Sequence, residues 1–247
     1  MRILFALVVA FSCASVSMSA AELPPLPELT DQAKARLAPL YEAYAKLDQE
    51  LAALPAPASN SERILRLKRR DEVGRATFPK IDFASLPVAD SHRAAMAAQL
   101  IIERQDVVNQ AELKAILPER GWFLNSELTP EANYAAFVIV RNAINPDIAF
   151  VKSVLSAMYR LLPTNEIQKT DVAMLADRVA VVDGVRQTFG TQMICDNFKW
   201  MLYPVADETK VDALRKEMGI DITLADQVTQ FATRSCPIAK YMGPIPK

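Results

Sequence analysis

The sequence predicts a mainly α-helical protein with one small β-hairpin insertion and an N-terminal helical pair. Glycine occurs only six times in 247 residues, whereas residues with high helix propensity, such as alanine, leucine and lysine, are abundant. Several segments begin at a residue that caps helices, as Thr129 does directly before Pro130, and continue with apolar residues three or four positions apart. The segment from Thr188 to Tyr203 differs, because apolar and aromatic residues there flank Asp196-Asn197 and predict the hairpin.

Residues 1–21 have the three parts of a secretory signal peptide. Arg2 gives a short basic start, Ile3 to Phe11 form an apolar run, and small or polar residues follow up to Ala21. The apolar run is too short to span a bilayer. We therefore expect cleavage before Glu22 and export to the periplasm or the exterior. Acylation at Cys13, as in a lipoprotein, is the alternative, although Phe11 is bulky for such a site.

Residues 22–84 are predicted to form the N-terminal helical pair and its linker. The first helix is expected to follow the capping residue Thr30, because six apolar residues spaced by three and four share one stripe. These residues are Leu37, Leu40, Tyr44, Leu47, Leu51 and Leu54. The second helix, from Ser61 to about Ala76, is expected to cover this leucine stripe. A linker that contains two prolines follows from Thr77.

Residues 85–247 are predicted to form a mainly helical domain. Its helices are expected to be capped by polar residues, namely Asp90, Ser91, Thr129, Asn145 and Asp171. The expected helices run from Asp90 to Leu117, from Pro130 to Ala143, from Pro146 to Leu162, from Asp171 to just before Gly184, from Asp207 to Met218 and from Thr223 to Arg234. The predicted hairpin lies between the fourth and the fifth of them.

The charge balance and the apolar segments exclude two classes of protein. The chain has 28 basic and 29 acidic residues, and removal of Arg2 with the signal peptide leaves 27 against 29, a net charge of −2. Proteins that bind nucleic acid carry a clear basic excess, so we expect no nucleic-acid partner. After the signal peptide no apolar run is long enough to cross a bilayer, so the mature chain is expected to have no transmembrane segment.

Two cysteines, Cys195 and Cys236, remain after removal of Cys13. Disulfides persist in the oxidising compartments outside the cytoplasm, so we expect these two residues to be bridged. The bridge would close a loop of about 40 residues and stabilise the fold by about 4 kcal/mol in the chain-entropy model. The alternative is a pair of buried thiols that pack as small apolar side chains.

Three stretches resemble an uncharacterised bacterial family, domain-of-unknown-function family 6624. They are Asp106–Gln110 with Leu113–Ile116 and Gly121-Trp122; Ala173–Val179 with Gly184, Gln187 and Phe189–Gln192; and Tyr203–Val205 with Val211–Arg215 and Met218–Ile220. Together they span about residues 90–224. The resemblance implies no activity. Where a Gln-His pair is expected from the family, this sequence has Arg141-Asn142, which weakens any enzymatic interpretation that needs that histidine.

The sequence identifies no catalytic residue, metal ligand set or cofactor motif. His92 is the only histidine, so a catalytic triad or a Cys-His pair could be built only around it. It lies in the first turn of a predicted helix, where the dipole disfavours an imidazolium, and we interpret it as a surface or capping residue. One histidine and two distant cysteines do not have the spacing of metal ligands, so we expect neither a metal nor another cofactor.

One group of polar residues stands out as a candidate ligand-binding site. It combines a carboxylate and a guanidinium near the end of a predicted helix with a hydroxyl and two amides in the following loop: Asp177, Arg178, Gln187, Thr191 and Gln192. Converging groups of this kind bind a polar ligand, or supply a general base. The alternative is that they bond the backbone of the loop itself, as buried polar groups require.

These observations leave three functional hypotheses. The first is a non-catalytic exported protein that binds a small polar ligand or an envelope protein through the polar cluster. The second is a hydrolase in which Asp177 or a neighbouring glutamate acts as general acid and base. The third is a structural module that self-associates through the leucine stripe. An open cleft with an unbonded carboxylate would favour the second hypothesis over the first.

Overall fold

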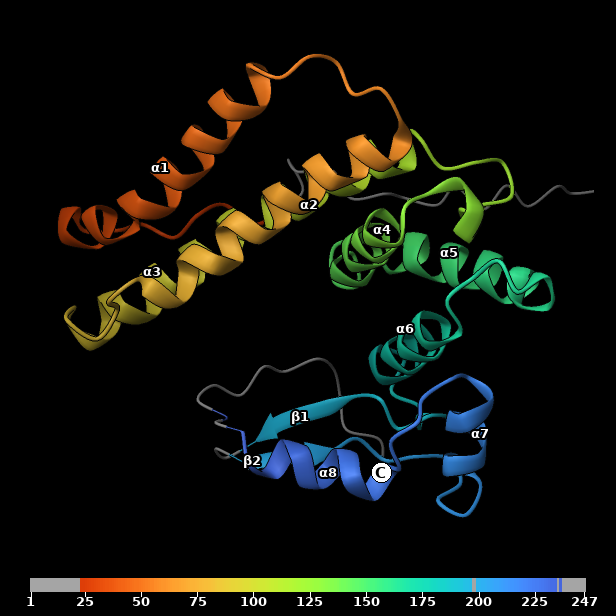
Figure 1. Ribbon diagram of the computed structural model, residues 1–247. Coiled ribbons are helices and arrows are strands. Elements are labelled where there is room, and N and C mark those ends of the chain that lie inside the picture. Colours follow the sequence, from red (N-terminus) through yellow and green to blue (C-terminus); the bar gives the residue numbers. More distant parts are fainter. Residues whose placement is uncertain (1–22, 197–198, 235, 237–247) are drawn as a thin grey trace, which may run out of the picture.

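The computed structural model describes residues 23–196, 199–234 and 236, and this part of the chain is mainly helical with one two-stranded hairpin (Figure 1). The predicted fold class is therefore confirmed. The predicted signal peptide, including Cys13, lies outside the described residues. No helix in the described ranges is long and apolar enough to cross a membrane.

Three long helices form one end of the molecule: α1 (Asp31–Ala52), α2 (Asn60–Thr77) and α3 (Val88–Lys114) (Figure 1). The Thr30 hydroxyl accepts a hydrogen bond from the backbone N–H of Ala33 and so caps α1, as predicted. The Ser59 hydroxyl caps α2 in the same way. A short 3₁₀ helix, η1 (Phe78–Lys80), lies in the linker between α2 and α3.

The leucine stripe of α1 is buried over most of its length, and both α2 and α3 pack against α1. Leu37, Leu40 and Tyr44 pack in one cluster with the alanine-rich start of α3, including Ala94 and Ala97. Val73 of α2 packs against the same cluster, so the predicted cover by the second helix is joined by α3. At the far end of the stripe Leu54 is 44% exposed.

The main core joins α2 to the next three helices, α4 (Pro130–Asn142), α5 (Ile148–Leu161) and α6 (Lys169–Val182). Ile64 and Leu67 of α2 belong to this core together with Phe137 of α4 and Leu175 of α6. The predicted N-terminal helical pair therefore contributes apolar side chains to the core of the segment that follows it. Two further 3₁₀ turns, η2 (Asn125–Glu127) and η3 (Leu162–Thr164), connect these helices.

Three predicted helix starts before the hairpin differ from the observed ones. Helix α3 begins at Val88, because the backbone N–H groups of its first turn bond the Pro87 carbonyl while the Asp90 carboxylate accepts a bond from Thr30 of α1. The cap of α5 is Asp147 rather than Asn145, since the Asp147 carboxylate accepts a bond from Phe150 N–H. Asp171 does not cap α6 but lies within its first turn.

The C-terminal part of the described chain contains the hairpin and two short helices. Strands β1 (Met193–Asp196) and β2 (Lys199–Leu202) pair antiparallel, with Met193 opposite Leu202. Helix α7 (Val211–Glu217) starts at Val211 rather than Asp207, and α8 (Leu224–Ala232) follows and lies beside the hairpin (Figure 1). The predicted disulfide is confirmed: Cys195 of β1 is bonded to Cys236, with the Cα atoms 5.6 Å apart.

Candidate functional site

The residues of the predicted polar cluster lie on α6, which carries Asp177 and Arg178, and in the loop between α6 and β1, which carries Gln187, Thr191 and Gln192. Asp177 projects from α6 and has no exposed surface. Its carboxylate accepts four hydrogen bonds of 2.8–3.0 Å, from the backbone N–H groups of Thr188, Phe189 and Thr191 and from the Thr191 hydroxyl. Burial raises the pKa of this carboxyl group, and the four donors oppose that shift. Asp177 is therefore bonded to the loop and does not reach solvent.

Gln187 fixes the same loop through both ends of its amide. Its nitrogen donates to the carbonyls of Gln192 at 3.1 Å and Tyr203 at 2.7 Å, and its oxygen accepts from the backbone N–H of Gln192 at 2.6 Å. The backbone of Gln187 also pairs with the segment after β2, through Pro204 and Ala206. Gln187 is completely buried, so its polar atoms serve the fold of the loop.

A buried guanidinium that the sequence analysis did not single out holds the loop from the opposite side. Arg215 of α7 has no exposed surface and donates to the Phe189 carbonyl at 2.8 Å and to the Gln227 side chain at 3.1 Å. Gln227 of α8 in turn donates to the Gly190 carbonyl at 2.7 Å. Side chains of three helices thus bond the peptide groups of one short loop. Gly190 adopts a φ of +66°, which favours glycine at the turn.

Above this loop lies a cavity of about 390 Å³, called here the arginine cavity. Its lining residues are Arg75 of α2, Arg141 and Asn142 of α4, Met174 and Arg178 of α6, Thr191 and Gln192 of the loop, Met193, Cys195 and Trp200 of the hairpin, and Phe231 of α8. Of the five predicted cluster residues, Arg178, Thr191 and Gln192 line the cavity. Asp177 and Gln187 are completely buried and are not among its lining residues.

Three guanidinium groups give the arginine cavity its charge. Arg75, Arg141 and Arg178 line it, and no aspartate or glutamate is among the described residues of its lining. Burial, together with the charges of Arg141 and Arg75, lowers the pKa of Arg178 to about 10, so this group is still protonated at neutral pH. Within the described part of the chain Arg141 has neither a hydrogen bond nor an ion pair, and its guanidinium carbon lies 5.9 Å from the Phe137 ring centroid.

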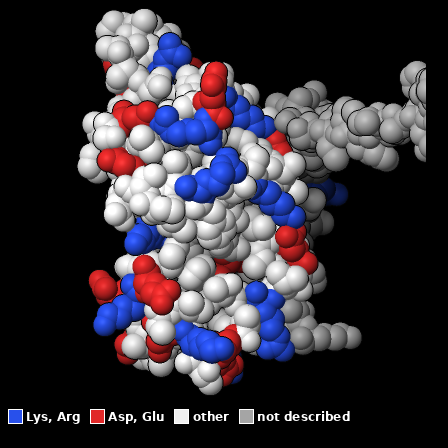
Figure 2. Space-filling model, turned by 90° about the vertical axis from the view of Figure 1, so that its right-hand side faces the viewer, with Lys and Arg blue, Asp and Glu red and all other residues white. Residues whose placement is uncertain are grey.

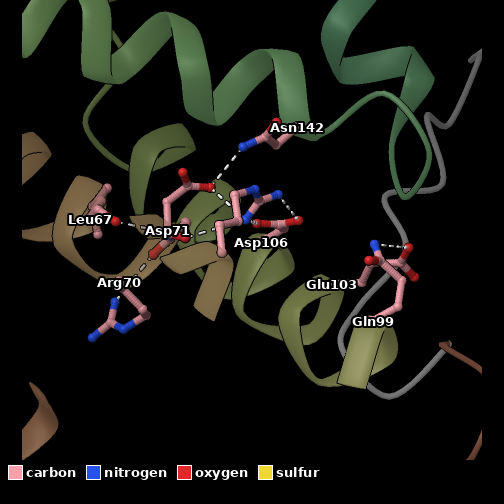
Figure 3. A network of polar contacts seen from close by, with 9 residues as sticks. Leu67, Arg70, Asp71, Gln99, Glu103, Asp106 and Asn142 are labelled. Atoms are coloured by element: carbon pink, nitrogen blue, oxygen red, sulfur yellow. Dashed lines mark hydrogen bonds and ion pairs between the residues drawn. The ribbon is translucent and has the colours of Figure 1, made fainter. Parts of the chain in front are cut away.

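Arg75 differs from the other two arginines because two buried carboxylates hold it. It makes a bidentate pair with Asp106, at 3.0 and 2.9 Å, and a 2.9 Å contact with Asp71. The Asn142 amide donates to Asp71 at 2.7 Å (Figure 3). Asn142 thus ties the end of α4 to this network, at the position where the family resemblance led us to expect a histidine.

Burial raises the pKa of Asp106 to about 6, and the bonds from Arg75 oppose this shift. The Tyr44 hydroxyl lies in the same region: burial and the charge of Asp106 raise its pKa, and no hydrogen-bond partner reaches it from the described residues. The network is therefore a polar interior between α1, α2, α3 and α4. The cavity reaches it only through Arg75 and Asn142.

The opposite side of the cavity is apolar. Trp200 of β2 and Phe231 of α8 are half-buried and meet edge to face, with ring centroids 5.2 Å apart. Met193 and the bridged Cys195 of β1 line this side as well, and Met174 of α6 adds a further thioether to the lining. The disulfide connects β1, the strand that pairs with the Trp200 strand β2, to the chain that follows α8.

The remaining candidates from the sequence are far from this arrangement or engaged elsewhere. His92 is exposed on α3 and does not line the cavity. Charged side chains alternate in sign over the face of the molecule shown in Figure 2. No group of histidines, cysteines and carboxylates among the described residues could hold a metal ion.

A family model described as "Family of unknown function (DUF6624)" matches residues 87–229. The chain belongs to this family. The matched segment of this DUF6624 protein contains all residues of the cavity lining except Arg75 and Phe231. No curated protein and no solved structure matches the chain.

Proposed function

We propose that this DUF6624 protein is an exported, non-catalytic protein that binds a small anionic ligand in the arginine cavity. The observation that carries the proposal is the meeting of three guanidinium groups in a cavity of about 390 Å³ whose described lining contains no carboxylate. Cavities that hold small ligands start at about 300 Å³ and have a few well-placed polar groups.

Arg141 and Arg178 are the groups best placed to hold the anion. The charge of Arg75 is balanced by the directly bonded Asp71 and Asp106, whereas Arg141 has no hydrogen bond or ion pair from the described residues and interacts with Asp171 only through the electric field. The lowered pKa of Arg178 reflects burial and repulsion by its two neighbours, and an anion between them would relieve that repulsion. Guanidinium groups bind carboxylate and phosphate through paired hydrogen bonds, which favours these two ligand classes.

Export is supported by the signal-peptide pattern of residues 1–21 and by the bond between Cys195 and Cys236, a type of bond that persists in oxidising compartments. Expression of the full chain in a bacterial host tests it. N-terminal sequencing of the periplasmic fraction should give a chain that starts at Glu22. Accumulation of the uncleaved chain in the cytoplasm would contradict export.

The other two hypotheses have less support. A general base must reach its substrate, but Asp177 is completely buried and accepts four hydrogen bonds. Asp71 and Asp106 lie behind Arg75 and are about 5% exposed or less. Self-association through the leucine stripe would need an exposed stripe, and Leu37, Leu40, Tyr44 and Leu47 are buried within the chain.

Calorimetric titration of the mature protein with inorganic phosphate, succinate and choline tests the proposal. At least one of the two anions should bind, and choline should not. Arg141→Gln should weaken anion binding at least tenfold, because it removes a charged donor worth about 1.5–3 kcal/mol. Arg36→Gln is the matched control, since Arg36 is an exposed arginine on α1 outside the cavity. The proposal fails if no anion binds, neither these two nor a carboxylate with an apolar body, or if both variants bind like the wild type.

A further inference from the structure

The two sides of the arginine cavity differ in chemistry. The charged side is formed by α2, α4 and α6, which present the guanidinium groups. The other side is formed by the hairpin and α8, which present Trp200, Phe231 and Met193. A ligand that fills the cavity therefore meets cations at one end and aromatic and thioether groups at the other.

From this division we infer that the ligand is an organic acid with an apolar, aromatic-sized body, of the arylalkyl carboxylate type. This inference rests on the proposed function, because it specifies the ligand of the same cavity. The carboxylate lies against Arg141 and Arg178, and the apolar body lies against Trp200 and Phe231.

The size of the cavity supports an organic ligand over a bare inorganic ion. A water molecule takes up about 30 Å³ in the liquid, and a small inorganic ion is not much larger, so such an ion would leave most of the 390 Å³ to water. Contact with water is unfavourable for the apolar methionine and aromatic surface on the hairpin side. A ligand with a ring removes that surface from water and still reaches the guanidinium groups.

The aromatic pair is also suited to receive a ring. Trp200 and Phe231 already meet edge to face and are only half-buried, so they have apolar surface left to cover. Aromatic groups prefer offset or edge-to-face contacts, which a third ring can add to this pair. The unbranched side chains of Met174 and Met193 adapt to the outline of an apolar guest.

Four probes of related structure separate the contributions. Phenylacetate carries both the ring and the carboxylate, acetate lacks the ring, 2-phenylethanol replaces the carboxylate by a neutral alcohol, and phenethylamine replaces it by a cation. We expect phenylacetate to bind the mature, oxidised protein at least tenfold more tightly than acetate or 2-phenylethanol. Phenethylamine should not bind.

Variants of the apolar side should change only the binding of the ring. Phe231→Ala should weaken phenylacetate several-fold and leave acetate nearly unchanged, and Met174→Ala, on a different element, should act in the same direction if the first variant disturbs α8. Tyr41→Ala is the matched control, because Tyr41 is an aromatic residue of α1, 48% exposed and outside this cavity. Circular dichroism verifies that each variant is folded.

The outcomes distinguish the inference from the proposed function. Equal affinity for phenylacetate and acetate, unaffected by the two apolar-side variants, would overturn the inference and leave anion binding in place. Equal affinity for phenylacetate and 2-phenylethanol would overturn it as well, since the carboxylate would then contribute nothing. Failure of every anion, including phosphate and succinate, would remove the proposed function itself.

Discussion

Replacement of Asp177 by alanine should destabilise the protein strongly, because this buried carboxylate is the acceptor for four hydrogen bonds from one loop. The substitution leaves three backbone N–H groups and one hydroxyl of the loop without their acceptor. An unsatisfied buried donor costs about 1–3 kcal/mol. The N–H of Phe189 is fully buried, whereas those of Thr188 and Thr191 are partly buried and regain some hydrogen bonding to water. We therefore expect a loss of about 3–5 kcal/mol in the free energy of unfolding.

Urea unfolding of the mature protein, followed by far-ultraviolet circular dichroism, measures this loss. The midpoint should fall while the slope with denaturant stays near the wild-type value. Thr191→Val is the control, because it leaves the three backbone donors to Asp177 in place; it removes the hydroxyl that donates to Asp177 and accepts from the Gln192 amide, and should cost about 1–2 kcal/mol. If Asp177→Ala proves no more destabilising than Thr191→Val, the idea that this carboxylate organises the loop is refuted.

Three further predictions concern the buried polar groups. Arg215→Met should lower the free energy of unfolding by about 3 kcal/mol or more, because buried acceptors at Phe189 and Gln227 lose a charged donor; a loss below 1 kcal/mol in urea unfolding would contradict this. Gly74→Ala should cost about 1–3 kcal/mol, because the new Cβ would lie 2.8 Å from Tyr44 Cζ, and the same change in a Tyr44→Leu background should cost much less. The raised pKa of Asp106 favours its protonated form in the folded state, so stability should fall by up to about 3 kcal/mol as pH rises from about 4, where the unfolded carboxyl ionises, through about 6. Urea midpoints measured between pH 4 and pH 7 should show this fall in stability with pH, and the fall should be smaller in Asp106→Asn. An identical fall in the variant and the wild type would contradict the attribution of this pH dependence to Asp106.

Local chemistry made most of the fold predictable. The caps at Thr30 and Thr129, each followed by a periodic apolar run, fixed two helices closely, and the loss of that period after Thr188 placed the hairpin. Helix starts were wrong where two capping residues stood near each other: Asn145 and Asp147 both suit a cap, and only the folded backbone selects the second. The sequence predicted the contact of α2 with the leucine stripe, but not that of α3, because the stripe does not show how many later helices pack on α1.

The candidate site was predicted only in part. Residues 177–192 are close in the chain, so the turn at Gly190 brings them together in any compact fold, and the spacing was sufficient to find them. Arg75 and Arg141 could not be found in this way, since they enter the cavity from helices far away in sequence. Whether Asp177 faces a ligand or a peptide backbone was equally undetermined, because the answer depends on burial. Asn142 carried a weak signal as a departure from the family pattern, and it lies in the lining.

The bond between Cys195 and Cys236 gives the cavity a dependence on where the protein is located. The arginines of the cavity come from α2, α4 and α6, whereas on the side with the rings β1 is bonded to the chain after α8 by a link that thiol reductants sever. A copy that stayed in the cytoplasm would keep its cationic half and lose the fixed position of its partner half. If the protein is exported and binds an organic acid as proposed, capture of that acid would begin only after secretion and oxidation of the two cysteines.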